Sequence, residues 1–172
     1  MKTSSLMRFI AILACISIAG AAMGDAYQKK QSAASLSIEG TYKLVSRKLA
    51  DGTMLNGQQV VGLMTFTKTY RNFNVCWKDS SGKYFSLSIA SAYKLTGSQY
   101  TETPLMSVMD DQLSGKGTTT TMGGESKTAA VTSNGGRIEF KMPFDPVTAV
   151  FEGGKFIANN EGVFTDTWEK VK

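Results

Sequence analysis

The sequence predicts a single all-β domain, an antiparallel sandwich or barrel, that follows a short export segment. From Thr41 onward, most of the chain consists of short runs in which apolar and polar side chains alternate with a period of two. Clusters of glycine, asparagine and aspartate separate these runs at intervals of roughly 8–12 residues, which is typical of antiparallel all-β domains.

Each expected strand is one of these alternating runs. In the first half of the domain they are 41–47, 60–67, 72–78, 85–93 and 99–105. The pairs Asp51-Gly52 and Asn56-Gly57 are turn signals in this half. In the second half the expected strands are 127–132, 137–144, 147–151, 155–158 and 163–171. The run 137–144 is the clearest of them, because apolar and charged side chains alternate along most of it.

The segment 106–124 departs from this rhythm. Met106, Met109 and Leu113 share one helical face, so the start of the segment is expected to form a short helix. The remainder is expected to be a long loop. Long loops in compact domains often serve as lids or binding loops, and the alternative is a loop without such a role.

The first 24 residues have the pattern of a secretory signal peptide. Basic Lys2 and Arg8 precede the apolar run 9–22. Because this run ends in small residues, cleavage is expected after Ala22 or Gly24. Such a chain is exported to the periplasm or the extracellular space. An apolar run of this length is too short to span a membrane as a helix.

Two further features concern this end of the chain. Cys15 could be the lipidated cysteine of a lipoprotein signal, but the apolar run continues past it, which disfavours lipoprotein anchoring. The polar segment 25–37 is expected to be a flexible linker, so that the folded domain spans 38–172.

The composition excludes several kinds of site. The chain has no histidine, so neither a Ser-His-Asp triad nor a histidine-based zinc site can be built. Without the signal peptide, Cys76 is the remaining cysteine, which excludes an intramolecular disulfide. The net charge of +5 is scattered along the chain, so no nucleic-acid partner is expected. No cofactor, metal or catalytic residue is expected, and the protein is expected not to be an enzyme.

Short motifs at both ends of the domain resemble a known family. The opening stretch 39–46, Glu-Gly-Thr-Tyr-Lys-Leu-Val-Ser, is followed by Asp51-Gly52-Thr53. The stretch 61–67 and the closing Trp168-Glu169-Lys170-Val171 complete the pattern. Together they resemble the bacterial lipocalin-like domains, calycin-type β-barrels found in exported proteins.

The resemblance implies an antiparallel up-and-down barrel of about eight strands. It also implies roles for three residues at one barrel end. Tyr42 would take the place of the first-strand tryptophan, Lys170 that of the last-strand arginine, and Trp168 would add to the closure. A barrel of this size either fills with its own side chains or encloses one small ligand.

Alternation along the strands predicts which residues face the interior. Those expected to line the barrel or its rim, and so to contact a ligand, are Met64, Phe66, Phe73, Trp77, Phe85, Tyr93, Tyr100, Met106 and Met142. Arg71 and Glu102 leave alternatives open. They could face solvent, Glu102 could turn inward and pair with Arg71, or one of them could orient a polar head group.

The sequence therefore favours an exported, monomeric, lipocalin-like barrel that binds a small apolar or amphiphilic ligand. The alternative is a filled barrel that acts as an envelope interaction or structural protein without a small-molecule ligand. An internal cavity below about 300 Å³ would favour the alternative, because most ligand pockets are larger than this.

Overall fold

The computed structural model describes residues 36–172, and this part of the chain contains twelve strands and no helix. The predicted signal peptide, the Cys15 alternative and most of the predicted linker lie outside the described residues. The strands are β1 (Gly40–Leu49), β2 (Met54–Asn56), β3 (Val60–Phe66), β4 (Tyr70–Lys78), β5 (Tyr84–Leu95), β6 (Gln99–Asp111), β7 (Gly117–Met122), β8 (Lys127–Asn134), β9 (Arg137–Lys141), β10 (Thr148–Glu152), β11 (Lys155–Asn160) and β12 (Phe164–Lys170). Within residues 36–172, no helix is long and apolar enough to cross a bilayer.

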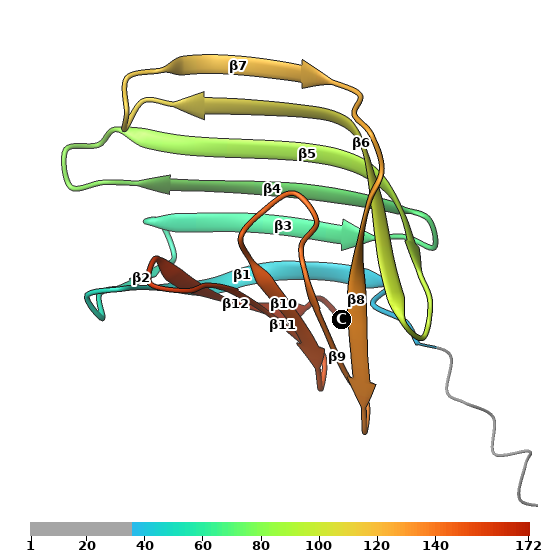
Figure 1. Cartoon of the computed structure of the whole chain (residues 1–172). Coiled ribbons are helices and arrows are strands. Elements are labelled where there is room, and N and C mark those ends of the chain that lie inside the picture. Colours follow the sequence, from blue (N-terminus) through green and yellow to red (C-terminus); the bar gives the residue numbers. More distant parts are fainter. Residues whose placement is uncertain (1–35) are drawn as a thin grey trace, which may run out of the picture. The chain divides into compact units, whose positions relative to one another are not determined.

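Ten of the strands form a closed antiparallel barrel (Figure 1). The ring runs in chain order through β1, β3, β4, β5, β6, β8, β9, β10, β11 and β12, and β12 returns to pair with β1. The antiparallel up-and-down barrel predicted from the sequence is confirmed. The expected number of about eight strands, which came from the resemblance, is too low. The ten alternating runs of the sequence correspond one to one to the ten strands of the ring.

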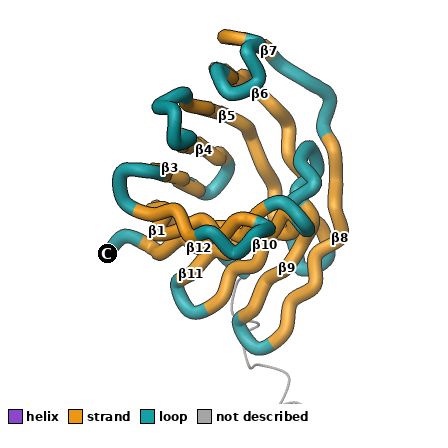
Figure 2. Tube along the Cα trace, turned by 90° about the vertical axis from the view of Figure 1, so that its left-hand side faces the viewer, coloured by secondary structure: helices purple, strands orange, loops and turns teal. Residues whose placement is uncertain are grey.

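Strand β6 has two different neighbours along one edge. Its first residues pair with β8, from Gln99 opposite Ala130 to Glu102 opposite Lys127, while β5 occupies the other edge. From Met106 onward the place of β8 is taken by β7, which pairs with β6 alone. The barrel is therefore closed at one half and open beside β7 at the other. Figure 2 shows β7 at the end of the arch formed by β3 to β7.

The prediction of a short helix and a long loop for 106–124 is wrong. Met106 to Asp111 continue β6, and the threonine-rich segment forms β7. The pairing of this stretch with β5 on one side and β7 on the other outweighs the helical spacing of Met106 and Met109. Threonine is β-branched and favours extended backbone, which is consistent with the strand.

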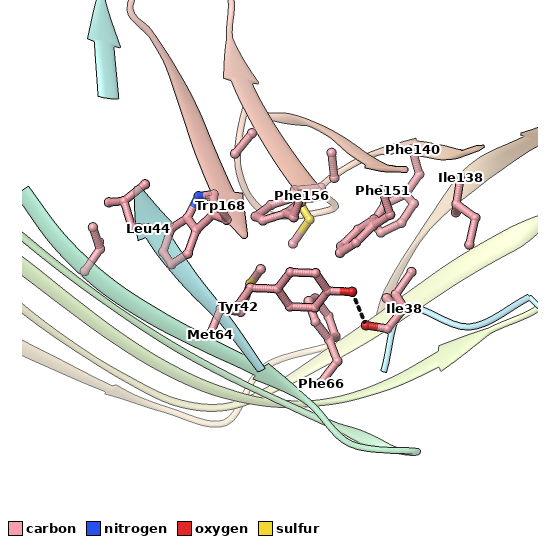
Figure 3. Close-up of a cluster of buried hydrophobic side chains, with 14 of the residues drawn as sticks. Ile38, Tyr42, Leu44, Met64, Phe66, Ile138, Phe140, Phe151, Phe156 and Trp168 are labelled. Atoms are coloured by element: carbon pink, nitrogen blue, oxygen red, sulfur yellow. Dashed lines mark hydrogen bonds between the residues drawn. The ribbon is translucent and has the colours of Figure 1, made fainter. Parts of the chain in front are cut away.

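The closed half of the barrel is filled by aromatic side chains (Figure 3). The Tyr42 ring meets Phe66, Phe151 and Phe156 edge to face, with ring centroids 5.7 to 6.4 Å apart. Its hydroxyl donates a hydrogen bond to the Ile38 carbonyl oxygen at 3.1 Å. Such aromatic pairs add to the stabilisation gained from the buried area itself. This half of the barrel is thus a packed core.

Gly62 of β3 leaves room for the Trp168 indole, which lies against that position. A Cβ atom built on Gly62 would lie 2.6 Å from Cη2 of Trp168, closer than van der Waals contact allows. Trp168 is fully buried, so it has no free space into which to move. The glycine therefore allows the wall of the barrel and its tryptophan to pack closely.

Replacing this glycine is expected to destabilise the fold. The substitution Gly62→Ala should lower the free energy of unfolding by about 1–3 kcal/mol, the usual cost of overpacking a core. Gly97→Ala is the control, because a Cβ atom at Gly97 meets nothing within 4 Å. Urea unfolding of both variants measures the effect. Equal stabilities for the two variants would contradict the packing of Trp168 described above.

Candidate ligand-binding site

An interior cavity of about 180 Å³ adjoins the aromatic core, several of whose side chains line it. Its walls come from the inner faces of β3, β4 and β5 on one side and of β1, β11 and β12 on the other. The segment Met142–Val147 between β9 and β10 completes them. The lining consists of Arg47, Met64, Phe66, Arg71, Phe73, Val75, Trp77, Phe85, Leu87, Met142, Asp145, Pro146, Val147, Phe156, Ala158, Asn160, Phe164, Asp166 and Trp168. Most of these side chains are apolar, and four are charged.

Six of the nine residues predicted to contact a ligand line this cavity. They are Met64, Phe66, Phe73, Trp77, Phe85 and Met142. Tyr93 and Tyr100 lie in the packed core instead, where Tyr100 stacks on Phe140 with ring centroids 4.3 Å apart. Met106 is 37% exposed on β6 and does not line the cavity. The prediction that Tyr93, Tyr100 and Met106 line the barrel or its rim therefore does not match the lining of this cavity.

The three residues assigned to the barrel end also have defined places. Tyr42 and Trp168 are buried in the core. The Lys170 ammonium lies 5.9 Å from the centre of the Tyr42 ring, and its side chain fills the space beside Gly40. A lysine at this distance makes a weaker contact with the ring than a planar guanidinium would.

A buried ion pair between Arg47 and Asp166 forms one part of the cavity wall. Arg47 Nε and Nη2 donate to the two carboxylate oxygens of Asp166 at 2.6 and 2.7 Å. The guanidinium lies between the Trp77 and Phe164 rings, 4.2 Å from each centroid. Bidentate pairing satisfies both charges inside the barrel.

Strict alternation along 41–47 would place Arg47 on the same face as Lys43 and opposite to Tyr42. The pairing of β1 with β12 shifts register between Leu44 and Ser46, which marks a β-bulge. One extra residue reverses the inward and outward phase of the strand, so Arg47 turns inward. Strict alternation could not have identified this residue as part of the cavity.

A second buried cluster surrounds the Glu102 carboxylate. Arg71 Nη1 donates to Glu102 Oε1 at 2.8 Å, and the Ser91 hydroxyl donates to the same oxygen at 2.6 Å. The Tyr100 hydroxyl donates to Oε2 at 3.0 Å. Of the alternatives that the sequence left open, Glu102 turned inward and paired with Arg71 is the observed one.

Burial and neighbouring charges change the pKa values of this cluster. Burial raises the pKa of the Tyr100 hydroxyl, and the Glu102 carboxylate raises it further. Burial also raises the pKa of Asp145, against the opposing effect of Arg71. For Arg71, burial opposes the charged form, but Glu102, Tyr100 and Asp145 together outweigh this effect and raise its pKa. Arg71 is therefore a permanent cation in the wall of the cavity.

Two buried N–H groups of the cavity lining lack an acceptor within the described part of the chain: Arg71 Nε and Trp168 Nε1. Arg71 is 5% exposed and Trp168 is not exposed. A buried donor without a partner costs roughly 1–3 kcal/mol, so few persist in native proteins. Both nitrogens are enclosed by the surrounding side chains, so they are sites of local cost within the wall.

Comparison with known proteins gives one structural likeness. No protein-family model matches the chain, and no curated protein matches it. The chain is similar to a lipocalin-like protein. That protein, from Bacteroides uniformis, matches with a TM-score of 0.32 and 14% sequence identity, over 77% of this chain and 97% of that chain. The assignment of the barrel in the present chain rests on its own strand pairing.

Removing one partner of the Arg47–Asp166 pair is expected to be costly. Asp166→Ala should lower the free energy of unfolding by about 3–5 kcal/mol, because it leaves the Arg47 charge buried and unpaired. The double variant Arg47→Met with Asp166→Leu should recover most of this loss.

The control for this experiment is an ion pair on the surface. Glu139→Ala breaks the Arg137–Glu139 pair, whose side chains are 45% and 41% exposed, and should cost less than about 1 kcal/mol. Chemical unfolding of the variants measures the differences. A loss for Asp166→Ala no larger than that for Glu139→Ala would contradict the buried pair.

Proposed function

We propose that the protein is an exported barrel that binds one end of a small apolar or amphiphilic molecule in the cavity. The observation that carries the proposal is a mostly apolar cavity whose lining also contains charged side chains, among them Arg71 and Asp145. An apolar occupant is stabilised by the loss of water-exposed surface, at about 25 cal/mol per Å².

The size of the cavity limits what can enter. A volume of about 180 Å³ lies below the range of about 300–1,000 Å³ found for most ligand pockets. Only a short group fits inside. The rest of a longer molecule would lie along the inner face of the open half, where Phe85, Leu87 and Ile89 of β5 are only partly buried.

The same volume favours the second candidate function, a filled barrel without a small-molecule ligand. Such a protein would act through its surface. The outer face of β1 and β3 carries three apolar side chains that are exposed by 42% to 54%: Val45, Val61 and Leu63. A contiguous exposed apolar surface of this kind can contact a protein partner.

Binding can be followed by the fluorescence of the protein itself, because both tryptophans of the chain, Trp77 and Trp168, line the cavity. Titration with short-chain alcohols should change the emission and saturate. Ala158→Leu fills the cavity from β11 and should weaken binding by about tenfold or more, because it removes the space for the occupant. Ala158→Val serves if the leucine variant does not fold.

The matched control is Ala130→Leu, at an exposed position of β8, which should bind like the unchanged protein. Equal affinity of the Ala158 and Ala130 variants would place binding outside the cavity. An absence of saturable binding by the unchanged protein would favour the filled barrel.

A further inference from the structure

We propose that the free edge of β7 pairs with the same edge of a second copy of the chain, which joins two barrels into a symmetric dimer. β7 pairs with β6 alone, so its other edge has no strand partner among residues 36–172 (Figure 1). The inference is independent of the cavity and of any ligand. It departs from the monomer expected from the sequence.

The composition of β7 leaves this edge without the features that normally prevent pairing. Edge strands of natural proteins are usually short, or they carry lysine, proline or a bulge. β7 contains four consecutive threonines, no charged residue and no proline, and its residues from Thr118 to Met122 are exposed. Its pairing with β6 has no register shift. β2, the other strand of the described part with a single partner, has only three residues.

The hydrogen bonds to β6 show which backbone groups of β7 face the free edge. The Gly123 N–H donates to the Leu105 carbonyl oxygen at 2.8 Å, in the same register as the β6–β7 pairs. Odd-numbered and even-numbered residues of a strand direct their backbone groups to opposite edges. The odd-numbered residues of β7 therefore face β6, and the N–H and C=O groups of Thr118, Thr120 and Met122 face the free edge.

This set of backbone groups is complementary to itself. A two-fold axis through Thr120 places even-numbered residues opposite even-numbered residues, as the free edge requires. Thr120 then lies opposite Thr120 of the second copy, and Thr118 lies opposite Met122. Each opposed pair can exchange two hydrogen bonds in an antiparallel ladder. Two copies use both of their β7 edges in this way, so the assembly closes as a dimer.

The side chains are compatible with this register. Met122 is 75% exposed in the single chain and gains a threonine neighbour from the second copy. The two Thr120 side chains meet at the axis, and opposed threonines are favourable cross-strand pairs. Because β7 has no charged side chain, no like charges oppose each other within the paired strands.

The charges that flank β7 favour an antiparallel second copy as the partner. Exposed Lys116 precedes the strand, and exposed Glu125 follows it by a few residues. Antiparallel pairing brings the start of one β7 beside the end of the other, so lysine and glutamate of different copies approach each other. A parallel arrangement would instead bring lysine beside lysine.

The size of the contact sets the expected strength. A standard interface buries about 800 Å² per partner, and one short strand buries less, so association is expected to be weak. At low micromolar concentrations the chain is expected to be a monomer in which the edge of β7 is free. Sedimentation velocity of the full chain from about 5 to about 500 μM, at low ionic strength, should show a reversible dimer at the upper end of this range.

Charged substitutions at the axis test the register. Thr120→Lys and Thr120→Glu should each weaken dimerisation by about fivefold or more, because each places like charges opposite each other. An equimolar mixture of the two variants should associate at least about fivefold more tightly than either variant alone, because opposite charges then meet. Gln58→Lys and Gln58→Glu, in the exposed turn between β2 and β3, are the matched controls and should dimerise like the unchanged chain.

A further variant keeps the test open if a charged variant does not fold. Thr120→Pro removes the N–H group that faces the free edge and spares the bonds to β6. Proline is tolerated at such positions of edge strands. This variant should also dimerise about fivefold or more weakly than the unchanged chain, because it cannot donate across the axis.

Three results would overturn the inference. An unchanged chain that stays monomeric at all concentrations would leave the edge to an extended segment of another protein. Equal dimerisation of the unchanged chain and the Thr120 variants would place the contact elsewhere on the molecule. A mixture of Thr120→Lys and Thr120→Glu that assembles no better than either alone would show that Thr120 does not lie opposite itself.

Discussion

The pairing of β12 with β1 is the constraint on which the rest of the molecule depends. It joins the two ends of a sheet that would otherwise have two free edges, and it gives the alternate side chains of ten strands one common interior. Trp168 enters the core from β12 opposite Leu44 of β1, and Asp166 of the same strand lies opposite Arg47. The core and the cavity wall thus depend on the same pair of strands.

The interior combines two environments along the barrel. Aromatic rings around Tyr42 fill the closed half, whereas charged and apolar side chains surround a cavity toward the open half. Buried charges are costly and are stable only when paired, and Arg47 and Arg71 each have a carboxylate partner. A purely structural barrel could be filled with apolar residues at less cost. The charged wall is therefore in keeping with the proposed binding of an amphiphilic molecule.

Much of this fold follows from the sequence, because alternation identifies both the strands and their inner faces. Phe73 and Phe85 were expected to face the interior, and both line the cavity. Alternation gave wrong results where the pairing between strands contains a register shift, because the shift changes which side chains face inward. The bulge after Leu44 turned Arg47 inward, and the register shift beside Ser91 accompanies the extension of β6 that replaced the expected helix. The partners of Arg71 could not be known without the register of the strands.

Hydrogen exchange of the full chain tests the closure of the barrel most directly. In a closed barrel both edges of β12 are paired, so its amides should exchange as slowly as those of the interior strands β4 and β10. β7, which pairs on one edge alone, should exchange faster than all of them. Exchange in β12 as fast as in β7 would show that β12 is an open edge, and the common interior described for this protein would not exist.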